Sequence, residues 1–287
     1  MLSETFQTPD RVRLSLAIPA GVIEIDASPG DTTQVELDAL SDSARELLES
    51  TRIEFRDRGD GHEVVVEVPT TKSGFFISFG RGPDFRLRVS CPTGAELDIQ
   101  TKSADVRARG MFGPSEVKTA SGDINLGEIG GDARVKTASG DVQIEDVHGV
   151  THVQTASGDL AIQRTRGDVT GQLVSGDVWI RDALHAVAVN TVSGDVRLDA
   201  VVEGSIDVTA ISGDIVVGVR RGSRVFVDCN TISGDTSSEL DLSDAPVPSD
   251  PAPSGEPGPQ LELRAKTVSG DIVVVRAAAP APLTSSA

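Results

Sequence analysis

Apolar and polar residues alternate along most of this chain, in short runs that glycine separates. After nearly every Ser-Gly-Asp triplet the first and third residues are apolar and the second varies, as in Ile124 and Leu126 on either side of Asn125. Alternation with a period of two predicts a strand that buries one face. Four residues before each Ser another apolar residue, for example Val117 or Val135, opens a second short strand. The pattern therefore predicts two strands for each triplet.

The Ser-Gly-Asp triplet recurs at a nearly constant interval, after a degenerate first copy at Ser103-Ala104-Asp105. Successive copies are 18 residues apart as far as Ser193, and the later intervals are 19, 21 and 36 residues. The longest interval holds a Pro-rich stretch, so we interpret residues 243–260 as a loop inserted into one coil. The Gly of each triplet suits a turn with positive φ. The predicted structural turns are Ser121, Gly122, Asp123, Ser139, Gly140, Asp141, Ser157, Gly158, Asp159, Ser175, Gly176, Asp177, Ser193, Gly194, Asp195, Ser212, Gly213, Asp214, Ser233, Gly234, Asp235, Ser269, Gly270 and Asp271.

These features predict an all-β fold, a single-chain parallel β-solenoid with about 18 residues in each coil. Equivalent strands of successive coils would lie side by side, parallel and in register, about 4.8 Å apart. A left-handed helix of hexapeptide repeats is the second interpretation, because its coils have a similar length. We rank it lower because the apolar positions do not recur every six residues.

Residues 1–95 lack the triplet, but they contain alternating runs that predict further strands. We expect this segment to form an irregular β-rich cap, continuous with a solenoid over residues 96–276. Between the runs, residues 41–49 predict a short helix with Ser41 or Ser43 as its N-cap. Residues 277–287 are expected to be disordered. The predicted strands of the cap are Val12–Ile18, Val22–Ile25, Gln34–Leu37, Glu63–Val68, Phe75–Phe79 and Phe85–Val89.

The composition limits the classes of partner. Of the 287 residues only 3% are aromatic and none is Tyr, so the core must be built from Val, Ile, Leu and Ala. The net charge of −18, without a dense run of Lys or Arg, disfavours nucleic acids and anionic lipid surfaces. No segment has the apolar length needed to span a bilayer, and the first residues show no signal-peptide pattern. We therefore expect no nucleic-acid partner, no membrane insertion and a cytoplasmic location.

The recurring pattern x-Val-x-Thr-Ala-Ser-Gly-Asp-Val-x-Ile follows a strand-rich leader that ends in Cys91-Pro92-Thr93-Gly94-Ala95. Together they resemble the bacterial putative-adhesin family of β-strand-repeat proteins, a domain family of unknown function, over nearly the whole chain. The resemblance implies a β-solenoid or β-helix fold. It brings no agreed catalytic or ligand residues to transfer.

The Asp of the triplet is the most prominent candidate for ligand chemistry, because stacking would place these carboxylates in a ladder. Like charges at such spacing repel unless something satisfies them. We favour turn capping, in which each carboxylate accepts hydrogen bonds from backbone N–H groups and the Ser hydroxyl of its own turn. The alternative is a calcium ladder, since carboxylate oxygens are hard ligands that suit this cation. The residues of that ladder would be Asp123, Asp141, Asp159, Asp177 and Asp195.

A column of Thr residues precedes the triplets and offers a second ladder. Facing outward, its hydroxyls would suit a regular lattice or a glycan. Facing their strand neighbours, they would stabilise the sheet, which is the interpretation we favour. The column consists of Thr101, Thr119, Thr137, Thr155, Thr191, Thr231 and Thr267.

No pattern of residues indicates a catalytic centre or a cofactor. His148 and His152 flank a predicted turn without a Cys or a third His nearby, so we expect surface residues and not metal ligands. Cys91 and Cys229 are too few for a disulfide scaffold. Trp179 is the only Trp and lies at an outward strand position, where either contact with a partner or packing beneath a loop would explain it.

We therefore expect a protein without enzymatic activity, cofactor or metal. The first hypothesis is a binding scaffold, or adhesin-like protein, that presents flat sheet faces to a protein or glycan partner. The alternative is self-association, in which a cytoplasmic structural protein polymerises through its terminal coils. A calcium-stabilised repeat protein is the second alternative. The Pro-rich loop and the helix of the cap look like obstructions to stacking, which favours the scaffold.

Overall fold

A computed structural model describes residues 1–69, 83–240 and 260–277, which form 23 strands and one helix. The chain divides into two compact units, Met1–Ala161 and Ile162–Ala287, and each is described by itself. Three predicted features lie wholly or mainly outside the described residues: the strand Phe75–Phe79, the inserted loop and the C-terminal tail. In the rest, the predicted all-β fold with parallel, in-register strands is confirmed.

In the repeat of the first unit, each coil contributes two short strands, as the alternation predicted. The strands β8, β10 and β12 pair in parallel, and so do β9 and β11. Their register places Val117 beside Val135 and Val135 beside Val153, and all three side chains are buried. The strands are β8 (Ser115–Lys118), β9 (Ile124–Ile129), β10 (Ala133–Ser139), β11 (Val142–Val147) and β12 (Thr151–Ser157), and β13 (Leu160–Thr165) follows.

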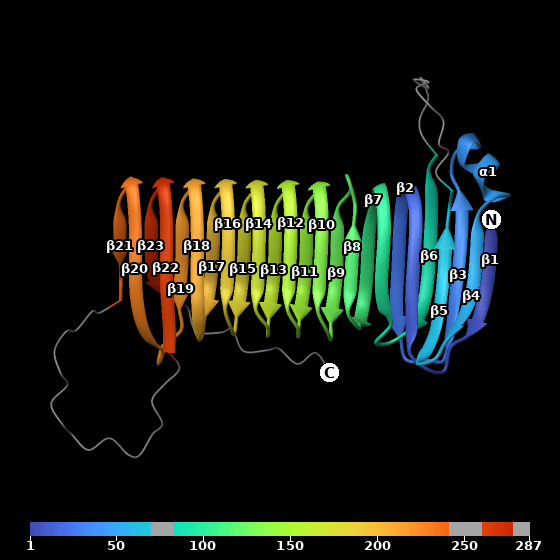
Figure 1. The fold of residues 1–287 in the computed structure, drawn as a ribbon, viewed down its shortest axis with the longest axis horizontal. Coiled ribbons are helices and arrows are strands. Elements are labelled where there is room, and N and C mark those ends of the chain that lie inside the picture. Colours follow the sequence, from blue (N-terminus) through green and yellow to red (C-terminus); the bar gives the residue numbers. More distant parts are fainter. Residues whose placement is uncertain (70–82, 241–259, 278–287) are drawn as a thin grey trace, which may run out of the picture. The chain divides into compact units, whose positions relative to one another are not determined.

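Two strands of 17 residues, β2 (Val12–Ser28) and β7 (Glu96–Phe112), lie next to these coils. Each supplies a whole coil, and the two pair in parallel from Arg13 beside Glu96 to Asp26 beside Arg109. On its other side β2 pairs with two strands in turn, β5 (Gly61–Glu67) and then β6 (Phe85–Pro92). The coil formed by β5 and β6 therefore lies beyond β2, although β2 comes earlier in the sequence (Figure 1).

Antiparallel strands border this outer coil. β3 (Thr32–Ala39) pairs with β6, β1 (Leu2–Gln7) pairs with β3, and β4 (Arg52–Arg58) pairs with β5. The helix α1 (Asp42–Leu48) follows β3, and its N-cap is Ser41, whose Oγ accepts a hydrogen bond from the backbone N–H of Ala44 at 3.2 Å.

The second unit continues the repeat with strands on two sides of each coil. β14 pairs with β16 and β16 with β18, and on the other side β15 pairs with β17 and β17 with β19, all in parallel. The strands are β14 (Val169–Ser175), β15 (Val178–Ala183), β16 (Val187–Ser193), β17 (Val196–Val201), β18 (Gly204–Ser212) and β19 (Ile215–Val219).

The last coil of the sequence is not the last coil in space. β22 (Gln260–Ser269) pairs with both β18 and β20 (Arg224–Ser233), and β23 (Ile272–Arg276) pairs with both β19 and β21 (Thr236–Ser238). The coil of β22 and β23 thus lies between its two predecessors (Figure 1). Its side chains fit this position, because Leu261 and Leu263 are completely buried. Simple stacking in sequence order, which the repeat alone suggests, is wrong at this point.

A ladder of hydrogen bonds connects neighbouring coils at the corner formed by the triplets. The backbone N–H of one Asp donates to the Oδ1 atom of the Asp in the adjacent coil, for example from Asp195 to Asp177 at 2.8 Å. The same bond runs from Asp271 to Asp214 and from Asp235 to Asp271, each at 2.8 Å, which agrees with the inserted coil. The remaining bonds join Asp123 to Asp105, Asp141 to Asp123, Asp159 to Asp141, and Asp214 to Asp195.

Glycine is required at this corner because adjacent backbones approach closely. Gly194 has a φ of +139°, and a Cβ atom there would lie 2.1 Å from the carbonyl oxygen of Gly176. Such contact is far inside van der Waals distance, so no other residue fits without a shift of the backbone. The in-register stacking of the coils therefore depends on the glycine of the triplet.

We expect Gly194→Ala to lower the free energy of unfolding by about 1–3 kcal/mol, through backbone strain and the clash with Gly176. Urea denaturation followed by circular dichroism measures this loss. The matched control is Gly30→Ala, because a Cβ atom at Gly30 meets no atom within 4 Å. Equal stability of the two variants would contradict the proposed role of the corner.

The ladder predicts different effects of two substitutions at Asp195, whose Oδ1 accepts the N–H of Asp214 at 2.8 Å. Asp195→Asn keeps an acceptor oxygen at the same place, so the free energy of unfolding should change little. Asp195→Ala removes the acceptor and should lower the free energy of unfolding by about 1 kcal/mol. Urea denaturation of both variants is the measurement, and an equal loss in both would show that the charge, not the acceptor, is what matters.

Candidate functional site

The Ser-Gly-Asp residues lie at the corners of the coils, where each Asp side chain bonds the backbone of an adjacent coil. The N–H donor comes from the neighbouring coil, whereas the predicted turn capping placed it in the same turn. Within the described parts of the chain, no group of three or more His, Cys, Asp or Glu side chains is arranged to hold a metal ion. The geometry at the corners is that of a joint between coils.

Most of the Thr column faces the interior. Thr137 is 8% exposed and Thr155 is 5% exposed, and each hydroxyl donates a hydrogen bond to the carbonyl oxygen of the Ser two residues later. Thr119, Thr191 and Thr267 are buried as well, whereas Thr101 and Thr231 are half-buried. Buried hydroxyls cannot form an outward row for a lattice or a glycan, so this candidate surface is not present at these positions.

Trp179 is half-buried on β15 and is held by its own chain. Its indole Nε1–H donates to Oδ2 of Asp199 at 2.8 Å, and the other oxygen of Asp199 accepts from Nε of Arg197 at 2.6 Å. Arg197 lies directly beside Trp179 in the parallel register. The only strong donor of the Trp side chain is therefore satisfied without a partner molecule.

Three histidines each lie near a carboxylate. Nδ1 of His62 is 3.1 Å from Asp57, Nε2 of His148 is 3.0 Å from Glu128, and Nδ1 of His185 is 3.5 Å from Glu203. His152 is exposed on β12. The contacts on His62, His148 and His185 are ion pairs or hydrogen bonds of surface loops and strands, and they bring no nucleophile next to a base.

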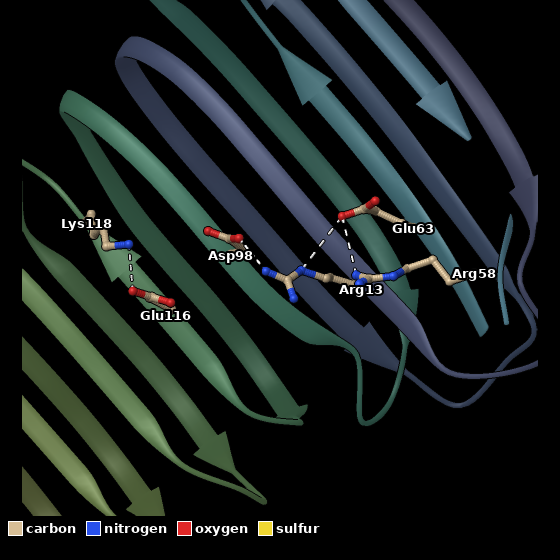
Figure 2. A network of polar contacts seen from close by, with 6 residues as sticks. All are labelled: Arg13, Arg58, Glu63, Asp98, Glu116 and Lys118. Atoms are coloured by element: carbon tan, nitrogen blue, oxygen red, sulfur yellow. Dashed lines mark hydrogen bonds and ion pairs between the residues drawn. The ribbon is translucent and has the colours of Figure 1, made fainter. Parts of the chain in front are cut away.

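A row of charged side chains crosses neighbouring strands of the first unit (Figure 2). Arg13 lies at its centre and donates from Nη2 to Oδ2 of Asp98 at 2.6 Å, while its Nε lies 3.8 Å from Oε1 of Glu63. Nη1 of Arg58 is 3.7 Å from the same oxygen of Glu63. The hydrogen bond to Asp98 raises the pKa of Arg13 above its ordinary value. The charges of this row neutralise one another across strands β4, β5, β2 and β7.

Next to this charged row is an open hollow of about 500 Å³. Its charges have mixed signs, and they already pair in part, as between His62 and Asp57. A shallow polar hollow of this kind neither excludes water nor presents a single sign of charge, so it does not favour one class of ligand. It is lined by Asp10, Arg11, Asp57, Arg58, Gly59, Asp60, Gly61 and His62.

A different surface of the second unit presents apolar side chains to solvent. We call Val174, Val192, Ile211 and Val268 the apolar row; their exposed fractions are 52%, 44%, 52% and 44%. Each immediately precedes the Ser of a triplet, and the parallel register of these Ser residues places the four side chains on adjacent strands β14, β16, β18 and β22.

Polar side chains flank the apolar row along each strand. The residue two positions earlier is exposed and polar in every case, as Gln172 and Asn190 illustrate. Before the three complete triplets of the first unit, the same position holds Ala120, Ala138 and Ala156. Single exposed apolar residues are ordinary, but contiguous ones mark interaction surfaces. The change from Ala to Val or Ile before the triplet is the signal that the sequence analysis missed.

The chain is similar to several solved structures at low sequence identity. The solved structures that resemble it include a putative adhesin from Bacteroides fragilis, with 13% identity, coverage of 96% of each chain and a TM-score of 0.46. A putative lipid binding protein from Parabacteroides distasonis has 12% identity, the same coverage and a TM-score of 0.43. Both TM-scores lie below 0.5, and neither relationship transfers a function to this chain.

No curated protein matches the sequence significantly. Among the described residues, no helix has the length and apolar character needed to cross a membrane. The model of the family described as Toastrack DUF4097 matches residues 15–275, which is nearly the whole chain and includes both units. The protein therefore belongs to the Toastrack DUF4097 family.

Proposed function

We propose that this protein is a non-enzymatic binding scaffold and that the apolar row of the second unit contacts a protein partner. The exposure of Val174, Val192, Ile211 and Val268 on adjacent, in-register strands is the observation that carries this proposal. Fully burying a Val or Ile side chain is worth about 1.5–3 kcal/mol. Because these side chains are about half exposed, covering each would contribute about 1 kcal/mol.

The chemistry of the surface favours a protein over the other partner classes. The row is aliphatic, and the neighbouring exposed residue Asn190 offers hydrogen bonds at the rim of the contact, as in protein interfaces. A glycan would require polar groups at the centre of the contact, where this surface has Val and Ile. The net charge of −18 opposes contact with an anionic membrane.

The surroundings of the candidate chemical groups also support a role without catalysis. The Asp residues of the corners accept backbone hydrogen bonds, and Trp179 donates to Asp199. Cys91 is buried, and burial raises the pKa of its thiol to about 12, which suppresses the reactive thiolate at neutral pH. We therefore propose a surface that recognises a partner by shape and apolar contact.

Replacing two central residues of the row tests the proposal. Val192→Thr and Ile211→Thr together keep β-branched side chains but add hydroxyls, so the fold should persist while partner binding weakens. A photo-crosslinking residue placed at Asn190 in cells would report the partner as a crosslinked product. We expect the double variant to reduce that product about tenfold, which corresponds to a loss of about 1.4 kcal/mol.

The matched control is the pair Ala138→Thr and Ala156→Thr, which adds the same hydroxyls to the same column in the first unit. This control should leave the crosslinked product unchanged. Equal losses from both pairs, or no loss from Val192→Thr and Ile211→Thr, would contradict the proposed role of the apolar row.

A further inference from the structure

The strand β20 forms an incomplete edge of the second unit. In the described part of the chain, only β22 pairs with β20, from Arg224 beside Gln260 to Ser233 beside Ser269. The inward side chains Val225 and Val227 are half-exposed, whereas Leu261 and Leu263, which lie beside them on β22, are completely buried. Among the described residues, none covers the core of the second unit at β20.

Two large apolar side chains are also exposed on the outward face of this edge. Phe226 is 65% exposed and Ile232 is 79% exposed, more than any member of the apolar row. An unpaired strand edge with exposed apolar residues favours pairing with another strand. In the part of the chain that the structure describes, the edge thus combines unpaired backbone donors and acceptors with apolar surface on both faces.

The edge strand β4 of the first unit differs in this respect, because charged side chains alternate along it. β4 carries Arg52, Glu54 and Arg56 at alternate positions, and Nη2 of Arg56 is 2.6 Å from Oε2 of Glu54. Charged side chains on an edge strand oppose pairing with another chain. On β20 the outward positions 224–232 hold the charged residues Arg224 and Asp228, with Phe226, Asn230 and Ile232.

We propose that β20 pairs antiparallel with the β20 strand of a second copy of this chain, around a two-fold axis at Cys229, and so forms a closed dimer. An isologous contact uses the same surface on both copies, so it is complete at two chains and does not propagate. In this dimer the sheet continues from one copy into the other, and each copy covers the open end of the other copy's core.

The position of the axis follows from the alternation of the strand. Inward residues must face inward residues, so the axis has to pass through a residue and not between two. The middle of Arg224–Ser233 allows Asp228 or Cys229. An axis at Asp228 would place that carboxylate directly opposite Asp228 of the partner subunit, and directly opposed like charges destabilise a sheet. An axis at Cys229 avoids this conflict.

With the axis at Cys229, the exposed apolar residues meet. Phe226 lies opposite the partner's Ile232. By the two-fold symmetry, Ile232 lies opposite the partner's Phe226, so all four side chains are covered. Asp228 lies opposite the partner's Asn230, whose amide can donate to the carboxylate. On the inner face Val227 lies opposite the partner's Thr231. Asp228 also lies beside Arg264 of its own chain, which reduces the cost of bringing it into the contact.

The protein contains a reporter for this contact, because the axis places Cys229 opposite the partner's Cys229. Residues directly opposite in an antiparallel pair have Cα atoms about 4.5–5.5 Å apart, within the range for a disulfide. Oxidation of the wild-type protein with copper–phenanthroline and oxygen should convert the two thiols into one disulfide. We expect a covalent dimer on a non-reducing gel, and none from Cys229→Ser. Cys91 is buried and should not react.

Charge substitutions test the register without relying on the cysteine. The double variant Phe226→Glu and Ile232→Glu places like charges opposite each other, and so does the double variant Phe226→Lys and Ile232→Lys. Each should be monomeric by light scattering, with a dissociation constant raised at least tenfold. A mixture of the two double variants should form heterodimers, because every Glu then faces a Lys. The matched controls are Val150→Glu and Val150→Lys at an exposed position of the first unit, which should leave the mass unchanged.

Three results would overturn the proposal. The wild-type protein could stay monomeric at about 100 µM, or its mass could keep growing with concentration. The third result is a mixture of the two charge variants that stays monomeric. Ile232 lies beside Val268 at the end of the apolar row, but the proposed dimer does not use Val192 or Ile211. If the protein dimerises through β20 but the double variant Val192→Thr and Ile211→Thr still binds the partner, the dimer is supported and the proposed function is contradicted.

Discussion

The hydrogen bond from the backbone N–H of one Asp to the side chain of the Asp in the adjacent coil is the interaction on which the rest of this structure depends. It requires the glycine before each Asp, because adjacent backbones approach so closely that a Cβ atom would overlap a carbonyl oxygen. The bond fixes the register of neighbouring coils. Once the register is fixed, every outward and inward column is fixed with it.

Because coils stack in register, a column of side chains becomes a surface feature only through small differences between repeats. The residue before the Ser is Ala in the repeats of the first unit and Val or Ile in those of the second. This residue is exposed next to the corner of the coil in both units. A repeat protein can therefore create an apolar surface by adding a few methyl groups to one column, without any change of backbone.

The outermost coil of each unit departs from sequence order, and the burial of apolar surface explains the arrangement in the second unit. β5 and β6 lie outside β2, which precedes them in the chain, and β20 and β21 lie outside β22 and β23, which follow them. In the second unit the more apolar coil takes the inner position, where Leu261 and Leu263 are buried. The coil with Asp228 and Asn230 takes the edge, which makes the edge available for contact with a second copy.

The sequence by itself determined the all-β class, the parallel coils and the corner at each triplet, because these depend on alternation and on glycine, which are local properties. It did not determine which way the Thr column faces, how coils 36 residues apart are ordered, or that Asp199 holds Trp179. Those features depend on contacts between residues far apart in the chain, and only the folded structure decides them. The apolar row does have a signal in the sequence, the change from Ala to Val or Ile before the triplet Ser, but its exposure on adjacent strands is a property of the fold. The edge strand β20 could not be found from the repeat, because only its place next to β22 exposes it.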